Sequence, residues 1–208
     1  MPTLEETPRV LTPEEFLTLP QARFEGEVVL AETPEDALKA LSRLSGEPVL
    51  GFDTETRPTF KKGISYTPSL VQLAGEELVV LMRPGAFPAW DHLAEVLGNA
   101  LVVKAGVAVR DDLVGLGKLG PLAPKGFEDI GEWARKMGWP VTGLRNLAAA
   151  LLGMRVSKKA RLTNWEAKRL SPVQVCYAAT DAWVSRELYL RMRPLKKKKG
   201  FVLPRSSG

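Results

Sequence analysis

The stretch GFDTET, residues 51–56, follows a short apolar run and has the composition of a buried β-strand. Side chains alternate between the two faces of a strand, so Asp53 and Glu55 project from the same face. Neighbouring carboxylates repel each other, and both stay ionised only when a cation compensates them. The candidate cations are hard divalent ions that bind oxygen ligands, Mg²⁺ or Mn²⁺. The alternative is that the strand ends in solvent, where both acids are simply hydrated.

Two further acids stand in apolar surroundings. Asp112 follows the apolar run 101–103 and lies at the start of a predicted helix, where capping is the alternative explanation because the helix dipole favours acids. Asp181 lies inside a predicted helix among alanines, and Tyr177 precedes it by one turn on the same face. Sites that cleave phosphodiesters hold two cations about 3.5–4 Å apart. The acids that are candidates to surround such a pair are Asp53, Glu55, Asp112 and Asp181.

The rest of the chain predicts an α/β or α+β domain with a central mixed β-sheet flanked by α-helices. Alternating and apolar patterns predict strands at 27–31, 48–56, 69–74, 77–82 and 101–104. Helical patterns cover 34–44, 90–97, 109–116, 128–137, 143–152 and 171–192. Ser171 and Gln174 form a capping box for the last helix, and Pro194 predicts that it ends near Met192. Residues 1–24 predict an extension with a short helix near 13–19.

Composition narrows the class of protein. The chain has 208 residues, 45% of them apolar, which suits one compact domain with a substantial core. No apolar run reaches the roughly 18–20 residues of a membrane span, and the N-terminus lacks a signal-peptide pattern. The single cysteine, Cys176, excludes an internal disulfide, so we expect a reducing, cytoplasmic location.

The formal net charge of +5 is unevenly distributed. Residues 194–208 carry five basic residues and no acid, so the rest of the chain is neutral overall. Residues 154–169 carry six basic residues against one acid. Such a patch attracts polyanions, but an exposed loop with no binding role gives the same pattern.

Three motifs resemble those of the DEDD superfamily of 3′–5′ exonucleases. They are FDTET at 52–56, KAGVAVRDD at 104–112 and YAATDA at 177–182. The tyrosine four residues before the last aspartate is typical of the DEDDy branch, and the chain is most similar to ribonuclease D and to the exonuclease domain of the Werner-syndrome helicase. The resemblance covers roughly residues 27–192 and includes SLVQL at 69–73.

This resemblance implies a ribonuclease H-like fold and two divalent cations. The implied ligands are Asp53, Glu55, Asp112 and Asp181. Asp53 would bridge both cations, and Tyr177 would orient the attacking water. In the second motif, spacing from Gly106 favours Asp112, although Asp111 beside it stays an alternative.

The predicted protein is a metal-dependent 3′–5′ exonuclease that releases nucleoside 5′-monophosphates from nucleic-acid ends. Its predicted domains are an extension (1–24), the exonuclease domain (25–193) and a basic tail (194–208). DNA and RNA are both candidate partners, and no membrane partner is expected. The residues predicted to contact nucleic acid are Phe60, Lys61, Lys62, Lys158, Lys159 and Arg161. The competing hypotheses are a catalytically inactive binding module with the same fold and a nuclease for very short oligonucleotides.

Overall fold

The computed structural model describes residues 7–59, 66–84 and 90–198. In chain order, the elements are α1 (Pro13–Thr18), β1 (Glu27–Ala31), α2 (Pro34–Arg43), β2 (Val49–Thr56), β3 (Pro68–Ala74), β4 (Leu78–Met82), α3 (Trp90–Gly98), β5 (Val103–Gly106), α4 (Val109–Leu116), β6 (Phe127–Asp129), α5 (Ile130–Lys136), α6 (Leu144–Leu147), the π-helical segment η1 (Ala148–Leu152) and α7 (Pro172–Lys198).

The six strands form one mixed sheet in the order β1-β4-β3-β2-β5-β6. The central strands β2, β3 and β4 are antiparallel neighbours, whereas β1, β5 and β6 pair in parallel with the strands beside them. The predicted hairpin is present, because β3 and β4 pair directly after a short connection. The predicted mixed sheet flanked by helices is therefore confirmed.

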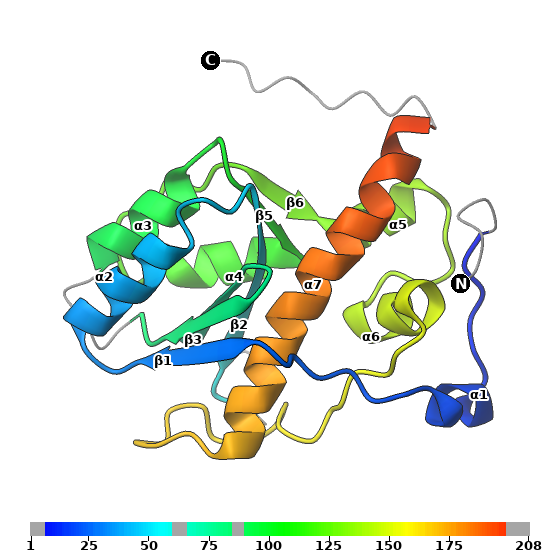
Figure 1. Ribbon diagram of the computed structural model, residues 1–208, viewed down its shortest axis with the longest axis horizontal. Helices are drawn as coiled ribbons and strands as arrows, with labels where there is room; N and C mark the ends of the chain where they lie inside the picture. Colours follow the sequence, from blue (N-terminus) through cyan, green and yellow to red (C-terminus); the bar gives the residue numbers. More distant parts are fainter. Residues whose placement is uncertain (1–6, 60–65, 85–89, 199–208) are drawn as a thin grey trace.

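The two faces of the sheet carry different helices. Helix α7 runs diagonally across one face (Figure 1), where its alanines pack on β3 and β4. Helices α2, α3 and α4 pack on the other face. A Cβ atom at Gly51 of β2 would lie 1.9 Å from the carbonyl oxygen of Ala182, so only glycine lets α7 approach the strand this closely. This approach brings the middle of α7 beside the acidic end of β2.

Two predictions about strands are wrong. Residues 128 and 129, predicted as the start of a helix, belong to the edge strand β6 (Phe127–Asp129), because the backbone of this segment pairs with β5. The fifth strand begins at Val103 rather than at Leu101, whose side chain is 90% exposed. In both cases, pairing with a neighbouring strand fixes the boundary, and short segments carry little of that information themselves.

The predicted end of the last helix is also wrong. Helix α7 continues through Pro194 to Lys198 instead of ending near Met192. Met192 and Leu195 are buried in the cluster formed with α5 and α6. Their burial offsets the backbone hydrogen bond that proline removes.

The N-terminal segment is packed against the domain. Its short helix α1 lies where a short helix was predicted, and it begins with a capping box between Thr12 and Glu15. Further along, Gln21 pairs with Arg155, and the backbone N–H of Phe24 donates to the Thr180 hydroxyl at 3.2 Å. The segment therefore reaches α7 one residue before Asp181. Among the helices of the described ranges, none is both apolar and long enough to cross a membrane.

Candidate active site

The two acids of β2 point to the face that α7 covers, as the alternation of the strand predicts. Glu55 is 8% exposed and pairs across the sheet with Leu70, while Asp53 pairs with Gln72. Phe52, the residue before Asp53, points to the opposite face of the sheet and packs edge-on against Phe127. The hydration alternative is thereby excluded, because neither acid stands on an exposed strand end.

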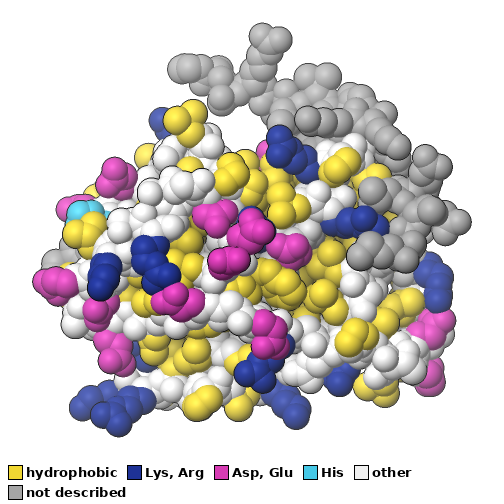
Figure 2. Space-filling model, in the orientation of Figure 1, with side chains coloured by type: hydrophobic (Ala, Val, Ile, Leu, Met, Phe, Trp, Pro, Cys, Tyr) yellow, Lys and Arg dark blue, Asp and Glu magenta, His cyan; other side chains and the backbone are white. Residues whose placement is uncertain are grey.

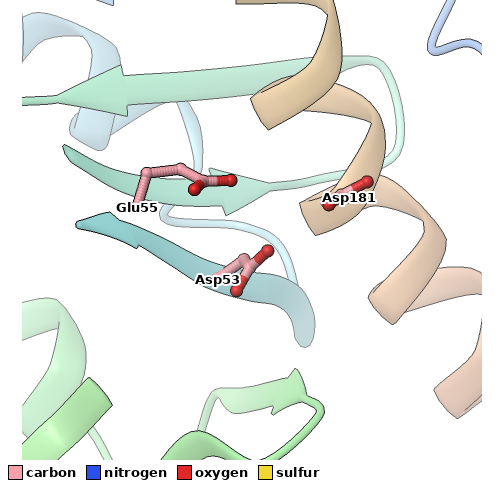
Figure 3. A group of neighbouring side chains, drawn as sticks. All are labelled: Asp53, Glu55 and Asp181. Carbon is pink, nitrogen blue, oxygen red and sulfur yellow. The ribbon is translucent and has the colours of Figure 1, made fainter. Parts of the chain in front are cut away.

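Helix α7 supplies the third acid. Asp181 is 4% exposed, and the hydroxyl of Tyr177, one turn earlier, donates a hydrogen bond to its carboxylate. Carboxylate oxygens of Asp53, Glu55 and Asp181 lie within 4.8 Å of one another. Figure 3 shows the three side chains directed into the space between β2 and α7. Residues 126 positions apart in sequence therefore form one acidic cluster.

The fourth predicted acid approaches from the other side of β2. Asp112, in the first turn of α4, accepts a hydrogen bond from the Thr54 hydroxyl at 2.5 Å. Its charge raises the pKa of Asp53 and of Glu55, so it stands near the cluster without belonging to the close set of three. Asp111 is exposed, and the geometry favours Asp112 of the two candidates.

The electrostatics of the cluster demand a counter-charge. Burial, followed by repulsion from Asp181 and Asp112, raises the pKa of Asp53 well above its ordinary value. Burial and the same kind of repulsion raise the pKa of Glu55 to about 10. Burial raises the pKa of Asp181 to about 7, although the Tyr177 hydroxyl acts in the opposite direction. Divalent cations among these oxygens would restore the ionised forms.

The residues present fit such cations. All the close donors are carboxylate oxygens, the ligand type that Mg²⁺ and Mn²⁺ prefer. Oδ1 of Asp181 is buried and has no hydrogen-bond partner within the described part of the chain. A buried anionic oxygen without a donor is stable only beside a cation or a donor that completes it.

Basic residues surround the cluster at a greater distance. The charge of Arg161 lowers the pKa of Glu55, and that of Arg145 lowers the pKa of Asp181. Lys159 lines a cavity of about 360 Å³ whose wall also includes Tyr177 and Asp181. Lys158 is exposed in the same loop. The predicted contacts Phe60, Lys61 and Lys62 lie outside the described residues.

Figure 2 shows acidic and basic side chains on the same face of the molecule. Acidic side chains gather near its centre, over the crossing of α7 and the sheet, and basic side chains stand at its lower edge as well as above and to both sides of that centre. Residues 156–171 run along the lower edge in Figure 1, before α7 begins.

Sequence reasoning missed three polar side chains of the site. Thr54 holds Asp112, Arg145 influences Asp181, and the side chain of Gln72 is completely buried opposite Asp53. A glutamine inside the apolar strand SLVQLA is a visible signal, because a buried amide in a sheet needs a partner. The other two give no such signal.

Comparison with known proteins identifies the class. A sequence model of the 3′-5′ exonuclease family matches residues 28–196, and the chain belongs to this family. It is 36% identical over 168 residues to ribonuclease D of Gluconacetobacter diazotrophicus, covering 77% of this chain and 41% of the relative. It is 29% identical over 195 residues to a 3′-5′ exonuclease of Arabidopsis thaliana, covering 85% of this chain and 67% of the relative.

Solved structures confirm the fold. The crystal structure of Escherichia coli RNase D, described as an exoribonuclease involved in structured RNA processing, superimposes with a TM-score of 0.76 and 22% identity. The match covers 85% of this chain and 47% of that one. The predicted ribonuclease H-like fold is thus confirmed, and the chain spans less than half the length of that structure.

Proposed function

We propose that this chain is a metal-dependent 3′–5′ exonuclease that hydrolyses the terminal phosphodiester of a nucleic acid and releases nucleoside 5′-monophosphates. The observation that carries this proposal is the set of three carboxylates within 4.8 Å, two of them buried and one partly buried, with the hydroxyl of Tyr177 donating to Asp181. Family membership supports the reaction class. The single cysteine supports a reducing, cytoplasmic location.

The acids divide into two overlapping ligand sets. Asp53, Glu55 and Asp181 would hold one divalent cation, and Asp53 with Asp112 would hold the second. When bound, such a pair activates water and neutralises charge on the leaving oxygen and on the phosphoryl oxygens. The raised pKa values mean that these acids, when they are ionised without a cation, destabilise the folded state.

Tyr177 has the geometry of a positioning group. Burial, then the negative charges of Asp181 and Glu55, raise the pKa of its phenol, so Tyr177 stays protonated at neutral pH. Its hydroxyl therefore acts as a hydrogen-bond donor or acceptor and not as a phenolate base. From its position beside Asp181, it would hold the attacking water in line with the phosphorus atom.

The basic loop before α7 would bind the strand. Lys159 stands in the wall of the cavity that reaches Tyr177, and the charge of Arg161 reaches Glu55. Lys158, Lys159 and Arg161 would neutralise backbone phosphates, which gives affinity without sequence preference. The names of the relatives favour RNA, and we propose RNA ends first and DNA ends second.

The test is a degradation panel with 5′-labelled RNA, single-stranded DNA and duplex DNA, each with Mg²⁺, Mn²⁺ or EDTA. We expect a ladder of products shortened from the 3′ end, nucleoside 5′-monophosphates, and no reaction in EDTA. Asp53→Ala should bind substrate and leave it intact. Binding without degradation by the wild-type protein in either metal would contradict the proposal and favour the inactive binding module.

A further inference from the structure

Gln72 of β3 is the residue that the proposed mechanism leaves unexplained. Its side chain is completely buried, and neither its amide nitrogen nor its amide oxygen has a hydrogen-bond partner in the ranges that the structure describes. Its neighbours on the same face, Leu70 and Ala74, are apolar and pack under α7. A glutamine buried here loses its hydrogen bonds to water without gaining others, which destabilises the fold. A position of this kind therefore ordinarily carries an apolar residue.

The register of the sheet places this amide beside the acids. Gln72 is directly opposite Asp53 in the antiparallel pair of β2 and β3, and directly opposite residues have Cβ atoms about 4.5–5.5 Å apart on the same face. That face is the one covered by Ala178 and Ala182 of α7, the helix that carries Asp181. Gln72 thus borders the acidic cluster from the side of β3, whereas Asp112 borders it from α4.

The unpartnered atoms are complementary. Within the described residues, four buried side-chain nitrogen or oxygen atoms have no partner, and three of them belong to Gln72 and Asp181. Gln72 offers an N–H donor without an acceptor, and Oδ1 of Asp181 is an acceptor without a donor. The other side of the Asp181 carboxylate already receives Tyr177. A donor on the free oxygen would fix the rotation of this carboxylate.

We propose that Gln72 is a positioning residue of the cation site, whose amide N–H donates to Oδ1 of Asp181 and orients that carboxylate toward the bound cation. This inference rests on the proposed function. A neutral donor suits the task, because a lysine or arginine would neutralise the acids and compete with the divalent cation. Partners that hydrogen-bond metal-binding carboxylates typically change metal affinity by tenfold to a hundredfold when they are removed.

The test compares Gln72→Leu and Gln72→Met with the wild type by isothermal titration with Mn²⁺. We expect Mn²⁺ affinity to fall about tenfold to a hundredfold, and kcat to fall while KM for a 5′-labelled oligonucleotide is unchanged. The two variants provide independent substitutions if one of them fails to fold.

Leu73→Val is the matched control. Leu73 is the next residue of β3, is completely buried, and points to the opposite face. This substitution should lower the melting temperature and keep the wild-type Mn²⁺ affinity. An equal loss of affinity in Leu73→Val would overturn the inference, because the effect would then follow stability rather than orientation.

The outcomes separate the two proposals. If the wild type binds Mn²⁺ and both Gln72 variants bind it equally well, Gln72 is not a positioning residue and the proposed function stands. If the wild type binds no Mn²⁺ at all, the proposed function fails and the role of Gln72 fails with it.

Discussion

Helix α7 buries two charged residues five positions apart, and their surroundings are opposite. Arg186 donates to the carbonyl oxygen of Val49, and its guanidinium lies 3.0–3.5 Å from the carboxylates of Glu47, Glu76 and Glu187. Asp181 faces the buried Glu55 and the partly buried Asp53, and one of its carboxylate oxygens has no partner within the described residues. The same helix, on the same sheet, therefore satisfies one charge and leaves the other in electrostatic conflict.

The difference separates a structural charge from a functional one. Buried ionic groups in a stable fold are paired and hydrogen-bonded, as Arg186 is. A buried carboxylate that raises the pKa values of its neighbours costs stability, and such costs concentrate at sites with a chemical task. The comparison predicts that substitutions at the two positions have opposite effects on stability and on activity.

The largest effect is expected for Asp181→Asn. Removing one of the three close carboxylates should reduce hydrolysis by about a thousandfold or more, since each ligand of the cation pair is needed for the transition state. The metal-free protein should melt at a higher temperature than the wild type, because one repelling charge is gone. Single-turnover degradation and differential scanning calorimetry measure the two quantities. Wild-type hydrolysis by this variant would remove Asp181 from the site.

A smaller kinetic effect is expected for Tyr177→Phe. Loss of the hydroxyl should lower kcat by about tenfold to a hundredfold, because the attacking water loses one positioning contact. Mn²⁺ affinity should also fall, by up to about tenfold to a hundredfold, because the hydroxyl hydrogen-bonds the Asp181 carboxylate without being a ligand itself. A wild-type kcat in this variant would contradict the positioning role of Tyr177.

Arg186→Met should show the reverse pattern. Removing the guanidinium takes one partner from the Val49 carbonyl and one from Glu47, which keeps the backbone N–H of Glu76. We expect a loss of about 2–4 kcal/mol in the free energy of unfolding. The rate of hydrolysis per folded molecule at 25 °C should be unchanged. Urea unfolding followed by circular dichroism measures the first quantity. A stable variant with impaired hydrolysis would break the division between structural and functional charges.

A further effect is the pH dependence of the metal-free protein. The folded pKa values of Asp181, about 7, and Glu55, about 10, lie above the ordinary values of the unfolded chain. Between the ordinary pKa of each acid and its raised pKa, the folded state therefore binds more protons than the unfolded chain. The stability of the folded state falls as the pH rises from about 5 to 9. Melting curves should show this decline without metal and a weaker one with saturating Mn²⁺. Equal slopes in both series would contradict cation binding at these acids.

The sequence was informative where a pattern is local. Alternation in GFDTET places both acids on one face, and the Ser171–Gln174 capping box is formed as predicted, with the two backbone hydrogen bonds at 3.0 and 3.3 Å. Patterns that depend on neighbours were not readable. The strand at Phe127–Asp129 exists because β5 lies beside it, and α7 passes Pro194 because Leu195 is buried.

The candidate site shows the same division. The three motifs predict Asp53, Glu55 and Asp181 as ligands, and the fold brings carboxylate oxygens of all three within 4.8 Å of one another. The position of Asp112 on Thr54 and the burial of Gln72 depend on how β2, β3 and α4 pack, which no single segment encodes. Side chains that support a site from neighbouring strands are therefore harder to predict than its ligands.

The central claim is that the mutually repelling carboxylates of Asp53, Glu55 and Asp181 bind divalent cations. The most direct measurement is anomalous diffraction from crystals of the protein soaked in Mn²⁺. The account predicts a strong anomalous peak at coordination distance from the carboxylates of Asp53, Glu55 and Asp181. Crystals at saturating Mn²⁺ with peaks only elsewhere, and none among these three carboxylates, would contradict it.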